Sequence, residues 1–225
     1  MTLASDRVIV IAAGAGNRWG NYGGTPKHFA PVQGEPTIAR TVRLFADAGD
    51  IWIVGSDERY RLPGTHLHVP EHRSVDFEAD RFTNSRHLWS PSGRTLLLLG
   101  DVWFSDEAAA TIKAWRGPDW QWFCRFGKSE MTGCSRPEGF AFALWPAHHQ
   151  LAEDALVRIV EERREGLLHR AQGWELYRAM AGALDLRWMR DHGHATRIDD
   201  LTQDFDYPQD YWTWLDAAGL KAAAA

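Results

Sequence analysis

The sequence has few cysteines and no long hydrophobic segment. Its two cysteines, Cys124 and Cys134, are too few for a disulfide framework, and we expect both to be reduced thiols. No apolar run approaches the length of a membrane helix. The short apolar run near the N-terminus has acidic Asp6 beside it and is shorter than the core of a signal peptide. These features predict a cytoplasmic protein that does not interact with membranes.

The sequence also lacks an excess of positive charge, internal repeats and low-complexity linkers. Its net charge of -5 argues against non-specific binding to nucleic acid, because proteins that bind in this way usually have basic surfaces. A hydrophobic content of 44% and a charged content of 24% are ordinary for a globular protein. The 225 residues are enough for one sizeable core. We therefore expect residues 1–225 to form a single domain.

Predicted strands and helices alternate along the chain. Residues 8–11 and 51–55 are continuous apolar runs typical of buried parallel strands, and residues 35–49 have the apolar spacing of a helix. Because crossovers between such strands are right-handed, this order predicts an α/β protein with a parallel sheet. Further strands are expected at residues 67–69, 94–104, 120–126 and 139–145, and further helices at residues 75–89, 106–115, 152–166 and 174–182.

A glycine-rich loop follows the first strand. Gly14, Gly16 and Gly20 carry no Cβ, so their backbone N–H groups can approach an anion closely. Arg18 and Lys27 add two positive charges to the same loop. This combination predicts a phosphate-binding loop.

The loop resembles the signature of the nucleotidyltransferases of the GT-A-like fold, which include the sugar-phosphate nucleotidyltransferases and the MobA-like NTP transferases. Their pattern is L-A-A-G-x-G-x-R-x-G, followed after a few residues by P-K. The matching residues are Ala12, Ala13, Gly14, Gly16, Arg18, Gly20, Pro26 and Lys27. The resemblance implies a three-layer α/β/α sandwich with a mostly parallel, Rossmann-like central sheet. It also implies a nucleotide-binding half at about residues 1–115 and an acceptor-binding half at about residues 116–225.

The same resemblance assigns roles to residues of the first half. Arg18 is expected to contact the β- and γ-phosphates of a nucleoside triphosphate, and Lys27 the α-phosphate under attack. Ser85 corresponds loosely to a serine that contacts the base or ribose, although a helix-capping serine would explain it equally well. The expected nucleotide-binding residues are Ala12, Ala13, Gly14, Gly16, Asn17, Arg18, Lys27 and Ser85, and the expected catalytic residues are Arg18, Lys27 and Asp101.

Two acidic segments resemble the metal-binding elements of the same family. Asp101 follows the most hydrophobic strand, and Asp206 precedes Tyr207 and a proline in the tail, where Tyr207 replaces the usual threonine. Asp204 would point to the same side as Asp206 in an extended segment, so the spacing does not choose between them. Hard oxygen ligands of this kind suit Mg²⁺. The resemblance implies Mg²⁺ as the cofactor, with Asp101 and Asp206 as ligands.

Other polar residues have simpler interpretations. Ser105 is expected to cap the helix at residues 106–115, and Asp210 to cap the last helix. The histidines at positions 66, 68, 192 and 194 lack the cysteine or carboxylate partners of a zinc site, so we interpret them as packed or solvated.

The polar loop at residues 127–138 occupies the region that faces the acceptor in relatives. Its Ser129, Thr132 and Glu138 are therefore candidates for acceptor binding, although an ordinary surface loop would have a similar composition. The resemblance implies a phosphorylated acceptor, most simply a sugar 1-phosphate, and a role in nucleotide-sugar biosynthesis. The nucleotide base, the acceptor and a homodimeric state are left open.

The predicted activity is that of a Mg²⁺-dependent nucleotidyltransferase. It would transfer a nucleoside monophosphate from a nucleoside triphosphate to the acceptor and release pyrophosphate. Two alternatives are a GT-A glycosyltransferase that uses a nucleotide-sugar and a catalytically silent nucleotide-binding module. A dinucleotide-binding dehydrogenase is excluded, because its helix would start at the glycines and no such helix is expected here.

Overall fold

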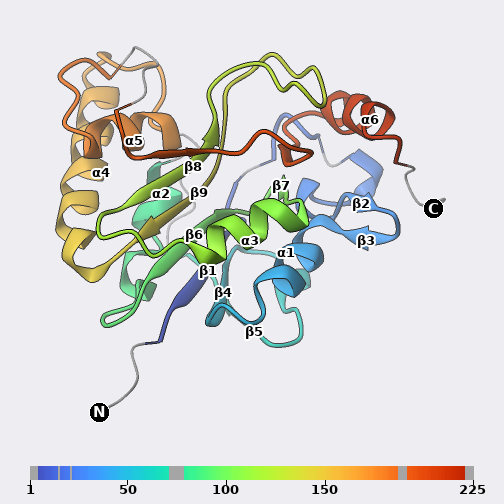
Figure 1. Ribbon diagram of the computed structural model, residues 1–225, viewed down its shortest axis with the longest axis horizontal. Helices are drawn as coiled ribbons and strands as arrows, with labels where there is room; N and C mark the ends of the chain where they lie inside the picture. Colours follow the sequence, from blue (N-terminus) through green and yellow to red (C-terminus); the bar gives the residue numbers. More distant parts are fainter. Residues whose placement is uncertain (1–4, 15, 21, 71–78, 187–191, 221–225) are drawn as a thin grey trace.

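A seven-stranded sheet forms the centre of the protein, in the strand order β10-β8-β9-β6-β1-β4-β5 (Figure 1). In this order β9 is antiparallel to both of its neighbours, and every other neighbouring pair is parallel. The strands are β1 (Arg7–Ile11), β4 (Asp50–Val54), β5 (Thr65–His68), β6 (Thr95–Leu99), β8 (Gln121–Arg125), β9 (Glu138–Leu144) and β10 (Ala195–Arg197). The structure is a computed structural model that describes residues 5–14, 16–20, 22–70, 79–186 and 192–220.

Helices cover both faces of this sheet. One face packs against α1 (Thr37–Phe45) and α3 (Asp106–Ala114), and the other against α2 (Ala79–Thr83), α4 (His149–Arg164) and α5 (Gly173–Met180). Figure 1 shows α4 and α5 side by side at one end of the molecule. The three layers confirm the expected α/β fold with a mostly parallel sheet.

The composition of β1 explains its central place. Val8 and Val10 belong to the core on the α1 and α3 side, whereas Ile9 and Ile11 belong to the core on the α4 and α5 side. Alternate residues of a strand point to opposite faces, so a continuous apolar run is what a strand covered on both faces requires.

A third hydrophobic cluster lies outside the two faces of the sheet and holds the C-terminal segment. Trp19, Trp103, Phe205 and Trp214 are buried in it. Two short antiparallel pairs and the last helix build it, namely β2 (Pro31–Val32) with β3 (Glu35–Pro36), β7 (Val102–Trp103) with β11 (Gln203–Asp204), and α6 (Pro208–Ala217). The cluster therefore joins residues from the glycine loop, the segment after β6 and the tail.

Several boundaries differ from the sequence-based expectations. The helix expected at residues 75–89 is α2 followed by a 3₁₀ turn, Arg86–Leu88, and residues 71–78 lie outside the described part. The helix expected at residues 35–49 ends at Phe45, and Gly49 does not cap it. A Cβ on Gly49 would lie 2.1 Å from the carbonyl oxygen of Asp6, so this position needs glycine for a close approach between two chain segments.

The two expected helix caps are confirmed. The Ser105 side chain accepts a hydrogen bond from the N–H of Ala108 at the start of α3. The Asp210 carboxylate accepts one from the N–H of Tyr207, 3.1 Å away, as the acidic member of a capping box on α6.

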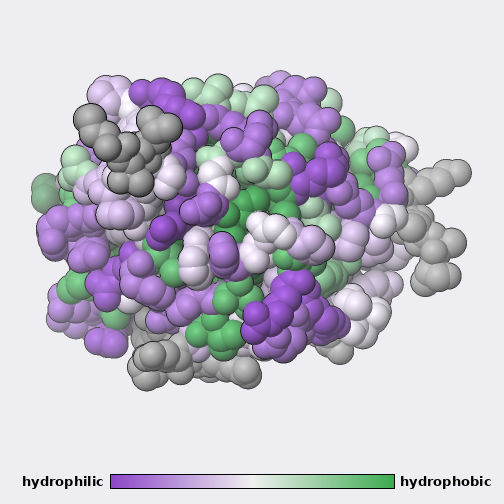
Figure 2. Space-filling view, turned by 90° about the horizontal axis from the view of Figure 1, so that it is seen from below, coloured by the Kyte–Doolittle hydropathy of each residue, from purple (hydrophilic) through white to green (hydrophobic). Residues whose placement is uncertain are grey.

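The face of the molecule seen from below is mainly polar. Figure 2 shows that hydrophilic residues cover most of this face, with hydrophobic residues in limited patches near its middle. None of the helices in the described part of the chain has both the length and the apolar character needed to cross a membrane.

The register shift between β8 and β9 predicts that one methyl group added at Gly139 destabilises the protein. Gly139 lies at this irregularity, and a Cβ there would be 2.0 Å from the ring of the fully buried Trp122. We expect Gly139→Ala to lower the free energy of unfolding by about 3 kcal/mol, because the ring and backbone must shift to admit it. Urea denaturation measures this. Gly127→Ala is the matched control, since nothing lies within 4 Å of a Cβ there; equal losses in the two variants would contradict the prediction.

Candidate active site

The first carboxylate of the site is held at the end of the central sheet. Asp101 follows β6 after Gly100, where a Cβ would be 2.8 Å from the carbonyl oxygen of Ile11. Glycine therefore lets this turn pack directly on the end of β1. The backbone oxygen of Asp101 accepts a hydrogen bond from the N–H of Phe205, 3.1 Å away, so the turn is also tied to the tail.

The tail adds two further carboxylates. Antiparallel pairing of β11 with β7 aligns Asp204 with Val102. One carboxylate oxygen each from Asp101, Asp204 and Asp206 lies within 4.8 Å of the others. The structure thus brings together both candidates that the sequence could not separate, and the donor set contains only oxygen.

Lys27 lies between the glycine loop and these carboxylates. Its Nζ forms ion pairs with Asp101 and, at 3.3 Å, with Asp206. Burial alone would lower the pKa of Lys27, but the carboxylates of Asp101, Asp206 and Asp204 raise it above its usual value. Lys27 is therefore a fixed cation at neutral pH although its side chain is almost fully buried.

The carboxylates differ in how well their charge is compensated. Burial raises the pKa of Asp101, but the charges of Lys27, His28 and Arg81 and the hydrogen bond from Lys27 together outweigh burial and hold that pKa well below the usual range. Burial, reinforced by Glu138, Asp206 and Asp101, raises the pKa of Asp204 well above its usual value. Negative charge is therefore in excess around Asp204, and a bound cation would relieve it.

Arg18 contacts the same cluster from the glycine loop. Its Nη1 is 2.5 Å from Oδ2 of Asp206, and its guanidinium carbon is 5.7 Å from the centre of the Tyr207 ring. The guanidinium of Arg136 approaches the same ring at 5.6 Å. The tyrosine that replaces the family's usual threonine is thus a packing partner for two arginines.

The glycine loop is closed by its own hydrogen bonds. Gly16 and Gly20 have φ values of 63° and 62°, which other residues rarely adopt. The N–H groups of Trp19 and Gly20 donate to the Gly16 oxygen, and the indole N–H of Trp19 donates to the Thr25 oxygen. At the start of the loop, the backbone N–H of Ala12 donates to the carbonyl oxygen of Val54 on the neighbouring strand.

A cavity of about 180 Å³ lies beside the loop. Of the expected nucleotide-binding residues, Gly14, Gly16, Asn17, Arg18 and Lys27 line it, as does the expected metal ligand Asp206. Ala12, Ala13 and Ser85 are not among the lining residues. The other lining residues, which sequence reasoning missed, are Trp19, Arg81, Arg163, His169, Arg170, Ala171 and Gln172.

Arg81 of α2 lies against the glycine loop. Its guanidinium atoms lie 3.1–3.2 Å from the position that a Cβ on Gly14 would take. The absence of a side chain at Gly14 therefore admits the guanidinium against the loop. No local motif predicts that Arg81 lines the cavity, because its position depends on how α2 packs beside the glycine loop.

Ser85 has partners inside the protein. It is fully buried, its hydroxyl donates to the Phe82 oxygen at 2.7 Å, and it accepts from the indole N–H of Trp89. The Ser85 side chain makes no capping hydrogen bond at the 3₁₀ turn Arg86–Leu88, so the capping interpretation is wrong. Its contact with a base or ribose stays a prediction.

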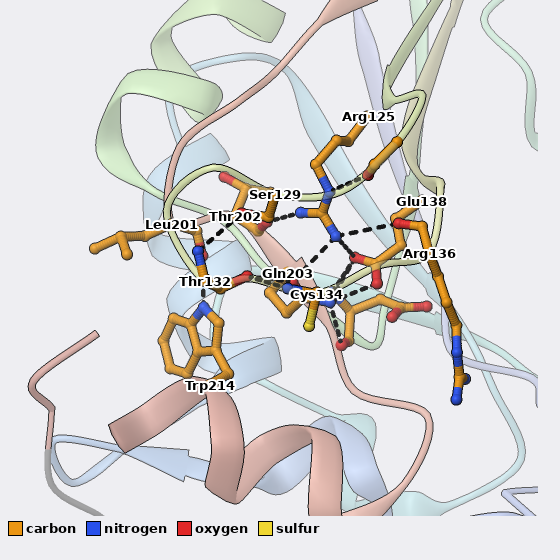
Figure 3. Close-up of polar contacts among 12 residues, drawn as sticks. Arg125, Ser129, Thr132, Cys134, Arg136, Glu138, Leu201, Thr202, Gln203 and Trp214 are labelled. Carbon is orange, nitrogen blue, oxygen red and sulfur yellow. Dashed lines mark hydrogen bonds and ion pairs between the residues drawn. The ribbon is translucent and has the colours of Figure 1, made fainter. Parts of the chain in front are cut away.

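The three candidate acceptor residues lie in a buried polar network (Figure 3). The Arg125 guanidinium forms an ion pair with Glu138 at 3.0 Å and donates to Gln203. Thr132 contacts the Gln203 amide oxygen at 3.5 Å, and the Ser129 hydroxyl accepts from the N–H of Thr132. None of the three candidates is among the residues that line the cavity, so acceptor binding by them stays a prediction.

The network supports the strand that carries Asp204. The Gln203 amide donates to both carboxylate oxygens of Glu138, at 2.5 and 2.6 Å, and the N–H of Asp204 donates to the same carboxylate. Burial raises the pKa of Glu138 to about 7, against the opposing effects of Arg125 and Gln203. Glu138 thus links β9 and the loop of residues 127–137 to the segment that carries Asp204 and Asp206.

Other candidates form no site. Cys124 and Cys134 form no disulfide bond in the described part of the chain. In the part of the chain that the structure describes, the histidines belong to no group of three metal-binding side chains, and His66 stacks on Trp52.

The glycine loop and the segment after it match a known family. Residues 8–82 match the family model of the MobA-like NTP transferase domain. Forty residues are 55% identical to 2-C-methyl-D-erythritol 4-phosphate cytidylyltransferase from Symbiobacterium thermophilum. That match covers 18% of this chain and 16% of the relative's length.

Solved structures extend the similarity to almost the whole chain. The inositol-1-phosphate CTP transferase from T. maritima superposes with a TM-score of 0.59 at 17% identity, over 95% of this chain and 96% of that one. The CTP:phosphocholine cytidylyltransferase from Streptococcus pneumoniae superposes with a TM-score of 0.53 at 12% identity, over 94% and 98%. At these identities the likeness establishes the fold. The resemblance to nucleotidyltransferases is confirmed for residues 8–82, which match the family model; for the rest of the chain these neighbours show the fold alone.

The buried ion pair between Arg125 and Glu138 predicts that removing the cation alone destabilises the protein more than removing both charges. Arg125→Met should lower the free energy of unfolding by about 3 kcal/mol, because it leaves the Glu138 carboxylate buried without its counterion. Adding Glu138→Gln removes the uncompensated charge and should restore part of this loss. Urea denaturation of the two single variants and the double variant measures the coupling. Purely additive losses would contradict the prediction.

The lowered pKa of the buried His28 predicts that the stability of the protein depends on pH. Burial, reinforced by Lys27, lowers the pKa of His28 from 6.5 to about 3, and its Nδ1 is 2.7 Å from the Tyr60 hydroxyl. Between these values the unfolded chain binds a proton that the folded chain does not, so stability falls as the pH falls from about 6.5 to 3. The full effect is at most about 5 kcal/mol. Urea unfolding at pH 7, 6 and 5 should show a steeper loss in the wild type than in His28→Gln; equal slopes would refute it.

Proposed function

We propose that the protein is a Mg²⁺-dependent nucleotidyltransferase. It transfers a nucleoside monophosphate from a nucleoside triphosphate to a phosphorylated acceptor, most simply a sugar 1-phosphate, and releases pyrophosphate. One observation carries the proposal: Asp101, Asp204 and Asp206 converge on Lys27, at the end of a glycine loop that lies within the family match. A cytoplasmic role in making nucleotide-sugars would fit this activity.

The donor set suits the proposed metal. Mg²⁺ prefers oxygen ligands and is commonly held by one or two carboxylates together with substrate phosphates. Asp101, Asp204 and Asp206 offer oxygen atoms close enough to share one ion. When bound there, Mg²⁺ would neutralise charge on the nucleotide phosphates.

The chain's own residues would position the phosphates. Lys27 is held by two carboxylates and stays protonated, so its charge is available where negative charge develops on the α-phosphate. The ion pair with Asp206 positions Arg18 to contact the β- and γ-phosphates, which leave as pyrophosphate. An acceptor phosphate oxygen would form the new bond to the α-phosphorus while the bond to the bridging oxygen breaks, and pyrophosphate would leave with that electron pair. Positioning and electrostatics supply the catalysis.

The alternatives fit the loop less well. A GT-A glycosyltransferase acts on a nucleotide-sugar and needs no pair of cations for a triphosphate. Arg18 and Lys27 both contact the carboxylate cluster, which supports a site built for a triphosphate and a metal. A catalytically silent nucleotide-binding module would have the same geometry. Only a measurement of turnover distinguishes it from a nucleotidyltransferase.

The test combines binding with turnover. One or more of the four nucleoside triphosphates should raise the melting temperature by several degrees with Mg²⁺, because ligand binding to the native state stabilises it. Pyrophosphate release with a phosphorylated acceptor should fall by about 10²-fold or more in Lys27→Ala and Asp101→Asn. Both variants should also bind Mn²⁺ differently from the wild type in an electron paramagnetic resonance titration, with weaker binding in Asp101→Asn.

Lys113→Ala and Asp216→Asn are matched controls. Lys113 pairs with Asp47 on the surface of α3, and Asp216 is exposed on α6, so both variants should keep wild-type rates. Binding of a nucleoside triphosphate without any release of pyrophosphate would support the silent module. No stabilisation by any nucleotide would refute the proposal.

A further inference from the structure

The ring of Tyr207 joins two loops at the edge of the carboxylate cluster. Tyr207 directly follows Asp206, so it belongs to the segment that carries the carboxylates. The guanidinium carbons of Arg18 and Arg136 lie 5.7 and 5.6 Å from the ring centre. Arg18 comes from the glycine loop, and Arg136 from the loop of residues 127–137, which Figure 1 shows reaching from β8 and β9 toward α6. One aromatic ring therefore holds a cation from each loop.

The two arginines differ in their acidic partners. Arg18 pairs with the carboxylate of Asp206. The exposed side chain of Arg136 contacts the ring of Tyr207 and forms no ion pair with any described residue. A ring face attracts a guanidinium, but it carries no net charge that could neutralise it. The positive charge of Arg136 therefore has no carboxylate to compensate it in the described part of the chain.

The buried polar network fixes the backbone of Arg136. The Arg136 carbonyl oxygen accepts a hydrogen bond from the Arg125 guanidinium, 3.5 Å away, and Glu138 pairs with the same guanidinium at 3.0 Å. Pro137 lies between them and disfavours a helical backbone at Arg136. Figure 3 shows the Arg136 side chain pointing away from this network. The network thus fixes where the side chain begins, and the Tyr207 ring fixes where it ends.

The charges at this place favour an anion between the two loops. Two guanidinium groups beside one ring repel each other, and Asp206, which compensates Arg18, is shared with Lys27. In the proposed function, a metal ion adds positive charge to the aspartates, and phosphate groups arrive at the same cluster. A guanidinium suits these groups because its N–H donors can bind two phosphate oxygens at once.

We infer that Arg136 binds a phosphate group of the substrates, and that Tyr207 is the positioning residue that holds its guanidinium beside Arg18; the inference rests on the proposed function. The phosphate belongs to the nucleoside triphosphate or to the acceptor. The loop of residues 127–137 then reaches the substrate through an exposed side chain, whereas its Ser129 and Thr132 are buried. A threonine in place of Tyr207 would offer Arg136 no ring face.

Calorimetric titrations with two probes test the role of Arg136. Pyrophosphate with Mg²⁺ represents the donor phosphates and is titrated into the nucleotide-free protein. Inorganic phosphate represents the acceptor and is titrated into the protein saturated with the α,β-methylene analogue of the nucleoside triphosphate that stabilises it most. Arg136→Gln should weaken at least one probe by about tenfold, because a charge-assisted contact is lost. Weaker binding of pyrophosphate assigns Arg136 to the donor, and weaker binding of inorganic phosphate assigns it to the acceptor.

Lys128→Gln is the matched control. Lys128 is an exposed cation of the same loop and contacts no aromatic ring among the described residues. This variant should bind both probes within about twofold of the wild type, because an exposed charge outside the site contributes little. If Arg136→Gln also binds both probes as the wild type does, or if the wild type binds neither probe, the inference is overturned.

Two substitutions of Tyr207 test the positioning role. Tyr207→Phe keeps the ring face and should keep the probe affinities within about twofold, whereas Tyr207→Leu removes it and should weaken the same probe by about threefold. In the Arg136→Gln background, Tyr207→Leu should have a smaller effect on that probe, because part of its effect acts through Arg136. Equal effects in both backgrounds, or a loss in Tyr207→Phe as large as in Tyr207→Leu, would overturn the positioning role.

Nucleotide binding and turnover separate this inference from the proposed function. If the wild type binds nucleotide and releases pyrophosphate, but Arg136→Gln changes neither the rate nor the affinity for either probe, the inference fails and the proposed function stands. If the wild type binds no nucleotide and releases no pyrophosphate, but its affinity for pyrophosphate still depends on Arg136, the proposed function fails and the phosphate site stands.

Discussion

The antiparallel pairing of β11 with β7 is the interaction on which the rest of the site depends. Two residues on each strand are enough to set Asp204 opposite Val102 and to bring Asp206 to Lys27. So short a pair is not stable by itself. The aromatic cluster around Trp214 and the network around Glu138 stabilise it from opposite sides. The carboxylate cluster is therefore a product of tertiary packing, not of local sequence.

Ion pairs organise the charges of the site. Arg125 pairs with the buried Glu138. Lys27 and Arg18 pair with the aspartates. Arginines from α2 and α4 line the cavity. The pKa shifts show that burial competes with these pairs: the pKa of Asp101 stays low, whereas burial raises the pKa of Asp204 and also that of Glu138, although Arg125 pairs with it.

The sequence predicted those parts whose signal is local. The apolar run of β1, the glycine loop with Arg18 and Lys27, and the caps at Ser105 and Asp210 each occupy a few adjacent residues, and the structure contains all of them. The convergence of Asp101 with the tail was expected from a family resemblance alone. Arg81, Arg163 and Arg170 were missed because separate segments of the chain bring them to the cavity, and no spacing along the chain encodes that arrangement.

The order of the carboxylates along the chain has a consequence for how the site is made. During synthesis the glycine loop, Lys27 and Asp101 are made well before Asp204 and Asp206. Until the tail is made, Lys27 can pair only with Asp101 of these three carboxylates, and the cluster is incomplete. The carboxylate cluster is therefore among the last parts of the structure that a growing chain can complete.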